Sequence, residues 1–176
     1  NHQRENLKRR YPFMRNKIST IYNGYDLEWF LPEEPSRNVD SPDLRLLVIA
    51  SISPGKNGLC LVRALNILRQ TYGITPAVSW VGEQVMSGER LLYRQKMDHE
   101  IAEFGLSTQW SWLGQRTDIV DLINNHDLLV HPSYGEGLPN VVCEALACGK
   151  PVIASNMLDH PRLVQDGVTG YLFDWQ

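Results

Sequence analysis

Residues 131–150 (HPSYGEGLPNVVCEALACGK) hold the densest group of backbone and side-chain groups that could bind a ligand. A glycine-bearing loop leads into an expected helix that has Pro139 in its first turn. Proline suits that position because its missing N–H would have no partner within the helix. The helix start also presents the amides of Gly137, Leu138 and Asn140. Together with the helix dipole they favour an anion or a cluster of hydroxyls, so the segment predicts a site for a phosphorylated ligand.

Two carboxylates accompany this helix start. Glu136 lies in the loop, and Glu144 lies four residues after Asn140, on the same face of the helix. A carboxylate close to a phosphate site suits the acceptance of hydroxyl hydrogen bonds. Two of them suit a ligand with two sets of hydroxyls, such as a ribose and a hexose. From the residues alone, two solvated glutamates explain the pattern equally well.

Two other loops could add to the same site. Residues 51–58 (SISPGKNG) place Lys56 near the start of the next helix, where its ammonium could pair with a phosphate. Residues 114–118 (GQRTD) offer Arg116 and backbone groups at the end of a strand. Taken by itself, Lys56 is more simply interpreted as an exposed lysine in a turn. Residues 114–118 by themselves do not indicate a function.

Other chemistries fit the sequence less well. The dinucleotide fingerprint needs a glycine where Asn140 stands, and it belongs at the first strand–helix turn rather than late in the chain. The sequence has no Walker loop, no metal-binding histidine pair and no Asp-x-Asp metal motif. The three cysteines form no CxxC and fit reduced thiols. We therefore expect no metal and no cofactor.

The elements that must position these residues alternate between strand and helix. The run at 44–51 is continuously apolar, as in a strand buried on both faces. The further expected strands are 77–81, 109–113, 128–131, 151–154 and 170–173, and the expected helices are 58–72, 89–104, 117–125 and 139–148. In the second helix, Leu92, Met97, Ile101 and Phe104 should face inward. Such alternation predicts an α/β fold, a Rossmann-like doubly wound parallel sheet that binds ligands beyond the carboxyl ends of its strands.

The chain divides at about residue 42. Residues 1–20 are basic and residues 26–43 are acidic and proline-rich, so we interpret 1–42 as a linker and 43–176 as the ligand-binding domain. A net charge of −3, with 21% charged residues, argues against a nucleic-acid binder. No apolar run approaches the roughly 20 residues of a membrane-spanning helix. We expect a cytoplasmic protein. Its basic residues 4–17 could attract anionic lipid at the inner face of a membrane, but a solvated helix is the simpler interpretation of them.

Several segments resemble a known family. EGLPNVVCEALACGKPVIAS followed by LVQDGVTGYLF resembles the C-terminal domain of glycosyltransferase family four, and Glu136 and Glu144 have the spacing of its Glu-x(7)-Glu motif. IYNGYDLEWFLP at 21–32 is similar to the segment that crosses from the family's first domain. ISPGKN at 52–57 is similar to its diphosphate-binding turn, and WLGQRTD at 112–118 to its base-binding loop. The order of these segments matches the family from residue 18 to residue 173.

The resemblance implies one half of a two-domain GT-B fold, in which two Rossmann-like domains face each other across the active site. This chain would be the donor-binding half, truncated at its C-terminus. The missing N-terminal domain would hold the acceptor. The implied reaction is transfer of a sugar from a nucleoside diphosphate with retained anomeric configuration, without a metal. The chain by itself should then be inactive.

The resemblance also implies roles for individual residues. Lys56 would contact the donor diphosphate and stabilise the charge on the leaving group. Glu136 would hold the transferred sugar, Glu144 the ribose hydroxyls, and the backbone near Arg116 the base. The remaining donor-binding positions are those of the helix start, Gly137, Leu138, Pro139 and Asn140.

Two positions depart from the family. Many members carry arginine where this chain has Ser51, so one cation at the diphosphate site is missing. Lys56, the helix amides or an arginine from elsewhere would have to compensate at the Ser51 position. The family also often has glutamate where Arg162 stands, and the sequence attaches no mechanism to that change.

Two other functions stay open at this point. One is a nucleotide-sugar epimerase on a related fold, which an assay for isomerisation of the free sugar nucleotide would separate from a transferase. The other is a non-catalytic fragment that only binds a nucleotide or a glycan. Calorimetry with a panel of nucleotides would show which ligand, if any, is bound.

Overall fold

The computed structural model describes residues 2–33, 44–83, 87–135 and 137–174. These residues form a six-stranded sheet in the order β3-β2-β1-β4-β5-β6, and every pairing in it is parallel. The strands are β1 (Arg45–Ile49), β2 (Ala77–Val81), β3 (Trp110–Gly114), β4 (Leu128–His131), β5 (Val152–Ser155) and β6 (Gly170–Phe173). The expected strands are all present, and their bounds differ from the expected ones by at most two residues.

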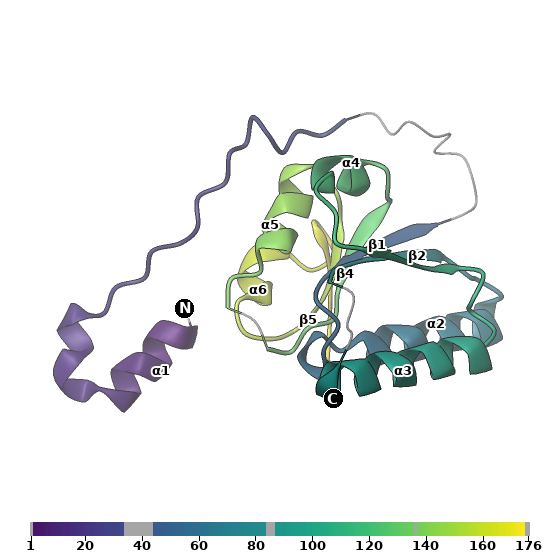
Figure 1. Cartoon of the computed structure of the whole chain (residues 1–176). Coiled ribbons are helices and arrows are strands. Elements are labelled where there is room, and N and C mark those ends of the chain that lie inside the picture. Colours follow the sequence, from purple (N-terminus) through teal and green to yellow (C-terminus); the bar gives the residue numbers. More distant parts are fainter. Residues whose placement is uncertain (1, 34–43, 84–86, 136, 175–176) are drawn as a thin grey trace.

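Helices cover both faces of this sheet (Figure 1). On one face lie α2 (Gly58–Tyr72) and α3 (Gly88–Glu103). On the other lie α4 (Ile119–Asn124), α5 (Asn140–Ala147) and α6 (His160–Leu163). The prediction of a Rossmann-like, doubly wound parallel sheet is confirmed. The short helix α6 was not expected from the sequence.

The central strand β1 shows why its sequence is continuously apolar. Leu46 and Val48 pack into the core cluster beneath α2 and α3, whereas Leu47 packs into the cluster on the opposite face. Successive side chains of a strand point to opposite faces, so a strand covered on both sides must be apolar at every position. All three of these side chains are at most 5% exposed.

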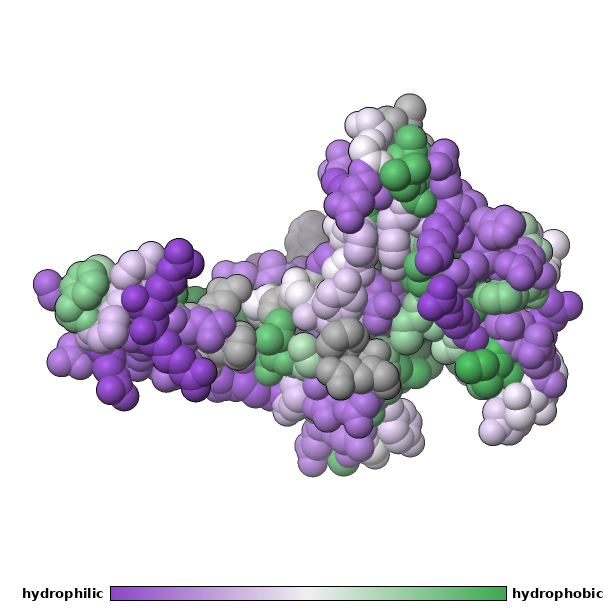
Figure 2. Space-filling view, turned by 90° about the horizontal axis from the view of Figure 1, so that it is seen from below, coloured by the Kyte–Doolittle hydropathy of each residue, from purple (hydrophilic) through white to green (hydrophobic). Residues whose placement is uncertain are grey.

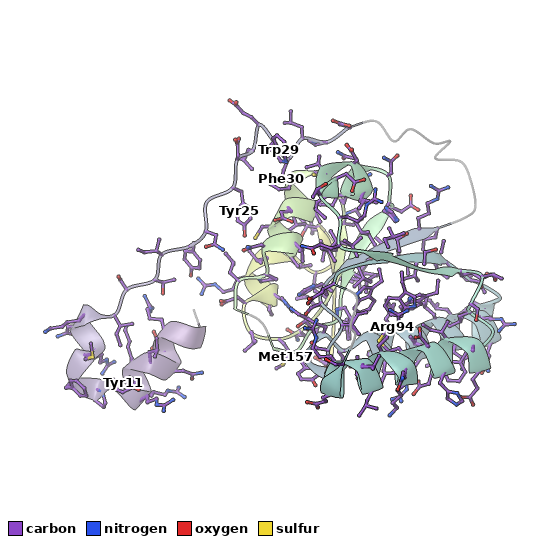
Figure 3. All side chains as sticks on the ribbon, viewed as in Figure 1. Tyr11, Tyr25, Trp29, Phe30, Arg94 and Met157 are labelled. Atoms are coloured by element: carbon purple, nitrogen blue, oxygen red, sulfur yellow. The ribbon has the colours of Figure 1, made fainter. Side chains whose placement is uncertain are left out.

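The core under α2 and α3 is rich in tryptophan. Trp80, Trp110 and Trp112 form a contiguous tryptophan cluster, with ring centroids 5.3–6.0 Å apart. The guanidinium carbon of Arg94 lies 3.7 Å from the centroid of the Trp112 ring. Figure 3 labels Arg94 on the α3 side of the sheet. This cluster fixes the β2–β3 edge of the molecule.

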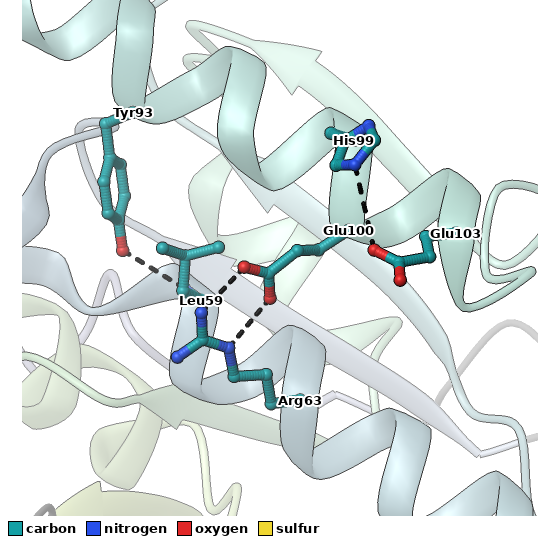
Figure 4. Close-up of polar contacts among 6 residues, drawn as sticks. All are labelled: Leu59, Arg63, Tyr93, His99, Glu100 and Glu103. Atoms are coloured by element: carbon teal, nitrogen blue, oxygen red, sulfur yellow. Dashed lines mark hydrogen bonds and ion pairs between the residues drawn. The ribbon is translucent and has the colours of Figure 1, made fainter.

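Polar contacts hold α2 against α3 (Figure 4). Arg63 donates to both carboxylate oxygens of Glu100, at 2.8 and 2.7 Å. The amide of Leu59 donates to the hydroxyl of Tyr93 at 3.1 Å. Tyr93 therefore takes an inward position four residues before Met97, and Leu92 next to it turns outward with 68% of its surface exposed. The prediction that Leu92 faces inward was wrong for this reason.

The N-terminal residues stand apart from the sheet. Helix α1 (His2–Arg10) and the 3-10 helix η1 (Pro12–Lys17) project to the left of the domain, and their surface is mostly hydrophilic (Figures 1 and 2). The assignment of residues 1–42 to a linker stays a prediction. None of the helices that the structure describes has both the length and the apolar character needed to span a membrane.

Residues 18–33, called the crossing segment below, lie against α5 and α4. Tyr25 and Phe30 reach from this segment toward α5 (Figure 3). Phe30 packs against the second core cluster, and the side-chain amide of Asn124 donates to the carbonyl oxygen of Leu31 at 3.1 Å. The crossing segment is thus attached to the domain at more than one place.

Candidate functional site

The site lies where the strand order reverses. Strands β1 and β4 are neighbours in the sheet, but the chain leaves β1 for α2 on one face and passes from β4 to α5 on the other. Their loops therefore separate, which is where doubly wound sheets bind ligands. The two loops are joined across this opening because the hydroxyl of Ser133 and the amide of Tyr134 both donate to the carbonyl oxygen of Gly55, each at 3.1 Å.

A pocket of about 180 Å³ opens at this point, and we call it the Lys56 pocket. It brings the turn after β1 together with the start of α5, although the two are more than 80 residues apart in the sequence. Its lining consists of Ile49, Lys56, His131, Leu138, Pro139, Asn140 and Val141.

Lys56 ends the 3-10 turn η2 (Pro54–Lys56), and its amide donates to the carbonyl oxygen of Ser53 at 3.0 Å. Asn57 follows in the left-handed conformation, with φ of 54°, and reverses the chain into α2. The side chain of Lys56 is half-buried, and this burial lowers the pKa of its ammonium group. A phosphate in the pocket would counter the cost of burying that charge.

The start of α5 supplies backbone donors. Pro139 is the residue before the helix rather than part of its first turn, so the helix begins one residue later than expected. The amide of Val142 already donates to the carbonyl oxygen of Pro139 at 3.2 Å. The two amides before it belong to Asn140 and Val141, which both line the Lys56 pocket. Donors at a helix start suit a phosphate or a carbonyl oxygen.

The structure describes only one of the two glutamates of the motif. Glu144 lies one turn beyond Asn140 and is half-buried, and burial raises the pKa of its carboxyl group. Burial raises the pKa of the nearby Tyr25 hydroxyl, and Cys143 and then the charge of Glu144 raise it further. Glu136 lies outside the described residues. Its role in holding the transferred sugar stays a prediction.

Other predicted site residues lie outside the lining of the Lys56 pocket. Ser51 follows the end of β1 and is half-buried. Gly137 is half-buried in the loop before Leu138. Arg116 lies after β3, at the edge of the sheet, where its Nε donates to Asp118 Oδ1 at 2.8 Å. That hydrogen bond lowers the pKa of the Asp118 carboxyl group. The structure does not bring Arg116 next to Lys56.

The crossing segment reaches the site directly, which the sequence did not indicate. The hydroxyl of Tyr25 donates to Asn140 Oδ1 at 2.9 Å, and the side-chain amide of Asn23 donates to the same oxygen at 2.8 Å. Tyr25 and Asn140 are 115 positions apart in the chain, and Asn23 and Asn140 are 117 positions apart. The side chain of Asn140 is therefore held at the mouth of the Lys56 pocket by two donors.

A buried histidine cluster, made of His131, Ser133, Ser155 and His160, lies beside the pocket. The rings of His131 and His160 meet edge to face with centroids 5.2 Å apart, and His160 Nδ1 lies 2.8 Å from the carbonyl oxygen of Ser155. The hydroxyl of Ser155 donates to the carbonyl oxygen of Ser133. Burial, with the neighbouring His160 and Lys56, lowers the pKa of His131 to about 3.

The position of His131 could have been found from the sequence, since it ends an apolar strand directly before the glycine loop. In doubly wound sheets such positions face the ligand. Among the described residues, no three side chains of histidine, cysteine, aspartate or glutamate gather as metal ligands would.

The model that describes glycosyl transferases group 1 matches residues 43–176. The chain belongs to this family. The resemblance drawn from the glutamate motif and the loops is thereby confirmed.

Relatives of this group 1 chain are glycosyltransferases. It is 29% identical over 166 residues to the D-inositol 3-phosphate glycosyltransferase of a Mycobacterium species, covering 90% of this chain and 36% of that one. It is 30% identical over 165 residues to the UDP-Gal:alpha-D-GlcNAc-diphosphoundecaprenol alpha-1,3-galactosyltransferase of Escherichia coli, covering 90% and 41%.

The structural relatives are GT-B glycosyltransferases. HepE of Anabaena, solved in complex with UDP-glucose, superposes with a TM-score of 0.78 at 27% identity, covering 91% of this chain and 44% of that one. This chain therefore spans less than half the length of each of these three relatives.

Proposed function

We propose that this chain is the donor-binding part of a retaining glycosyltransferase and that it binds a nucleoside diphosphate sugar at the Lys56 pocket. The observation that carries the proposal is the meeting of Lys56 with the amide-bearing start of α5 in one pocket. An ammonium group and two backbone amides suit a diphosphate. The UDP-glucose complex of HepE supports a uridine nucleotide as the first ligand to test.

The reaction that follows from this proposal breaks the bond between the anomeric carbon and the diphosphate oxygen. The electron pair stays on the diphosphate, a new bond forms between the anomeric carbon and an acceptor hydroxyl oxygen, and the proton of that hydroxyl passes to the leaving diphosphate. Lys56 and the first amides of α5 would stabilise the charge that grows on the leaving diphosphate. Lys56 would act more strongly there than in water because it is half-buried.

Calorimetric titration of the chain with UDP, GDP and ADP tests the donor site. Replacing Lys56 by methionine keeps the bulk of the side chain and removes its charge. It should weaken UDP binding by about 1–3 kcal/mol, roughly five- to 150-fold in Kd. Lys96→Met on the exposed surface of α3 is the matched control and should leave the Kd unchanged. Equal affinity for UDP in the wild type and Lys56→Met would contradict the assignment.

The role of Glu144 is tested with two ligands. If its carboxylate accepts ribose hydroxyls, Glu144→Gln should weaken UDP binding but leave the binding of inorganic pyrophosphate unchanged, since pyrophosphate has no ribose. Equal losses for the two ligands would assign Glu144 to the phosphates or to the stability of α5 instead.

The acceptor is part of the same proposal. The two curated relatives are named for an inositol phosphate and a GlcNAc-diphosphate lipid. Both acceptors carry a hydroxylated six-membered ring, and we expect an acceptor of this class. The relatives are more than twice as long as this chain, and transfer should need a second domain such as their greater length allows. A cytoplasmic location and contact with a membrane stay predictions.

A further inference from the structure

The last residue of β4 is a buried histidine that lines the Lys56 pocket. His131 is 2% exposed. Val130 before it packs into the core beneath α2 and α3, whereas Leu129 packs into the core on the opposite face. Side chains alternate along a strand, so His131 shares the face of Leu129, toward α5 and α6. The donor site proposed above uses Lys56 and the first amides of α5, and it gives this histidine no role.

The electrostatic surroundings of His131 come from two neighbouring elements. Among the described residues, Lys56 acts on its ring from η2 and His160 from α6. Burial, and after it the charges of His160 and Lys56, lowers the pKa of His131, so its ring is uncharged at neutral pH. The other residues that line the pocket carry no titratable side chain; they are Ile49, Leu138, Pro139, Asn140 and Val141. A titratable ring in a pocket, next to an ammonium group, is a candidate for a functional residue.

His160 adds a buried hydrogen-bond acceptor next to that ring. Its Nδ1 lies 2.8 Å from the carbonyl oxygen of Ser155, and this contact requires a proton on Nδ1 because a carbonyl oxygen only accepts. Nε2 is then an acceptor, and in the part of the chain that the structure describes this buried nitrogen has no hydrogen-bond partner. The edge-to-face contact of the two rings, with centroids 5.2 Å apart, brings this acceptor close to His131.

A diphosphate in the Lys56 pocket would reverse the charge balance around His131. Negative charge within hydrogen-bond reach favours the protonated imidazole, and Lys56 attracts the same anion. We propose that His131 takes up a proton when the sugar nucleotide binds and that the resulting imidazolium holds the diphosphate together with Lys56. Its two N–H groups then have two acceptors, a phosphate oxygen and Nε2 of His160. This role of His131 rests on the proposed function, and it makes donor binding dependent on pH.

Calorimetric titration of the whole chain with UDP-glucose tests this role. UDP-glucose is the suitable probe because its phosphates, unlike the terminal phosphate of UDP, do not titrate near neutral pH. From about pH 8 to about pH 6, the affinity of the wild type should rise by about threefold or more. At the lower pH, the heats measured in two buffers of different ionisation enthalpy should differ as proton uptake requires.

Replacing His131 by glutamine keeps a polar side chain that does not titrate. His131→Gln should lose the proton uptake and should bind UDP-glucose about threefold more weakly than the wild type near pH 6, whereas the two affinities should agree within about twofold near pH 8. His99→Gln is the matched control, since the side chain of His99 is 80% exposed on α3, and it should keep both the proton uptake and the pH dependence.

A measurement on the wild type alone gives a second test, which does not depend on the folding of a variant. In the chain with isotope-labelled histidine, the imidazole nitrogen signals of His131 in NMR spectra should change from the neutral to the imidazolium pattern when UDP-glucose is added near pH 6.

The outcomes separate this inference from the proposed function. If UDP-glucose binds without proton uptake, or if the uptake persists in His131→Gln, the inference fails and the donor site stands. If His131→Gln weakens binding equally at both pH values, His131 contacts the ligand without taking up a proton, and the inference is overturned. If UDP-glucose does not bind at either pH, the proposed function fails and the inference fails with it.

Discussion

The two halves of the sheet both bury aliphatic side chains, but they differ in the other groups that they bury. Beside β2 and β3, the tryptophan cluster fills the core with apolar rings, and Trp80 is 1% exposed. Beside β4 and β5, the histidine cluster places imidazoles and hydroxyls at the same depth, with His160 completely buried. The Lys56 pocket opens at the second region. Apolar packing thus stabilises the side away from the pocket, whereas buried polar groups accompany the side that we expect to bind ligand.

Breaking the apolar side should have the largest effect. Trp80→Ala removes a fully buried indole and leaves a cavity between β2 and α3, which should lower the free energy of unfolding by about 3–5 kcal/mol. Urea denaturation followed by circular dichroism measures this. Trp29→Ala is the control because Trp29 is 70% exposed, and it should change stability by less than about 0.5 kcal/mol. Comparable losses for the two variants would show that the tryptophan cluster is not the main source of stability.

The polar side should make stability depend on pH. Burial lowers the pKa of His131 to about 3 and also lowers the pKa of His160, so the unfolded chain binds these protons more readily than the folded one. The free energy of unfolding is therefore highest above about pH 6.5, which is the approximate pKa of histidine in the unfolded chain. It decreases as the pH falls toward the lower pKa of these histidines in the folded chain. Between pH 7.5 and pH 5, His131 alone should account for a loss of about 2 kcal/mol.

Urea midpoints at the two pH values measure this loss. His131→Gln should reduce it, since glutamine does not titrate. His99→Gln is the control, because the side chain of His99 is 80% exposed on α3, and its pH profile should match that of the wild type. A wild-type midpoint that is the same at pH 7.5 and pH 5 would contradict the burial of uncharged histidines.

The smallest effect is expected at the contact between the crossing segment and the pocket. Tyr25→Phe removes one of the two donors to Asn140 Oδ1 and leaves that of Asn23. UDP binding, measured by calorimetry, should weaken by about 0.5–1.5 kcal/mol, roughly two- to tenfold. Tyr11→Phe in the projecting N-terminal part is the control. An unchanged UDP affinity for Tyr25→Phe would limit this contact to a role in folding.

The sequence predicted the framework of the fold well because its signals are local. Each buried strand is a short apolar run, and glycine or proline separates most runs from the helices. Gly149, for example, follows α5 with φ of 71°, a conformation in which glycine is favoured. Leu92 was misplaced because two adjacent apolar residues, Leu92 and Tyr93, compete for one inward position. The hydroxyl of Tyr93 finds a partner at the start of α2, which no local pattern encodes.

The site was predicted only in part for the same reason. Lys56 and the helix start could be placed at one edge because the carboxyl ends of parallel strands share it. The bonds from Asn23 and Tyr25 to Asn140 depend on how residues 18–33 lie on α5. That path is set by contacts between residues more than 100 positions apart, such as that between Asn23 and Asn140. No periodicity or spacing in the sequence reports them.

The hold of Asn23 and Tyr25 on Asn140 has a thermodynamic consequence. If docking of the crossing segment raises the affinity of the Lys56 pocket for a nucleotide by some factor, the bound nucleotide must tighten the docking of that segment by the same factor. The two events are then reciprocal, whichever comes first. A force or a partner that moves residues 18–33 away from α5 would then lower the affinity for the nucleotide. A bound nucleotide would oppose that displacement by the same free energy.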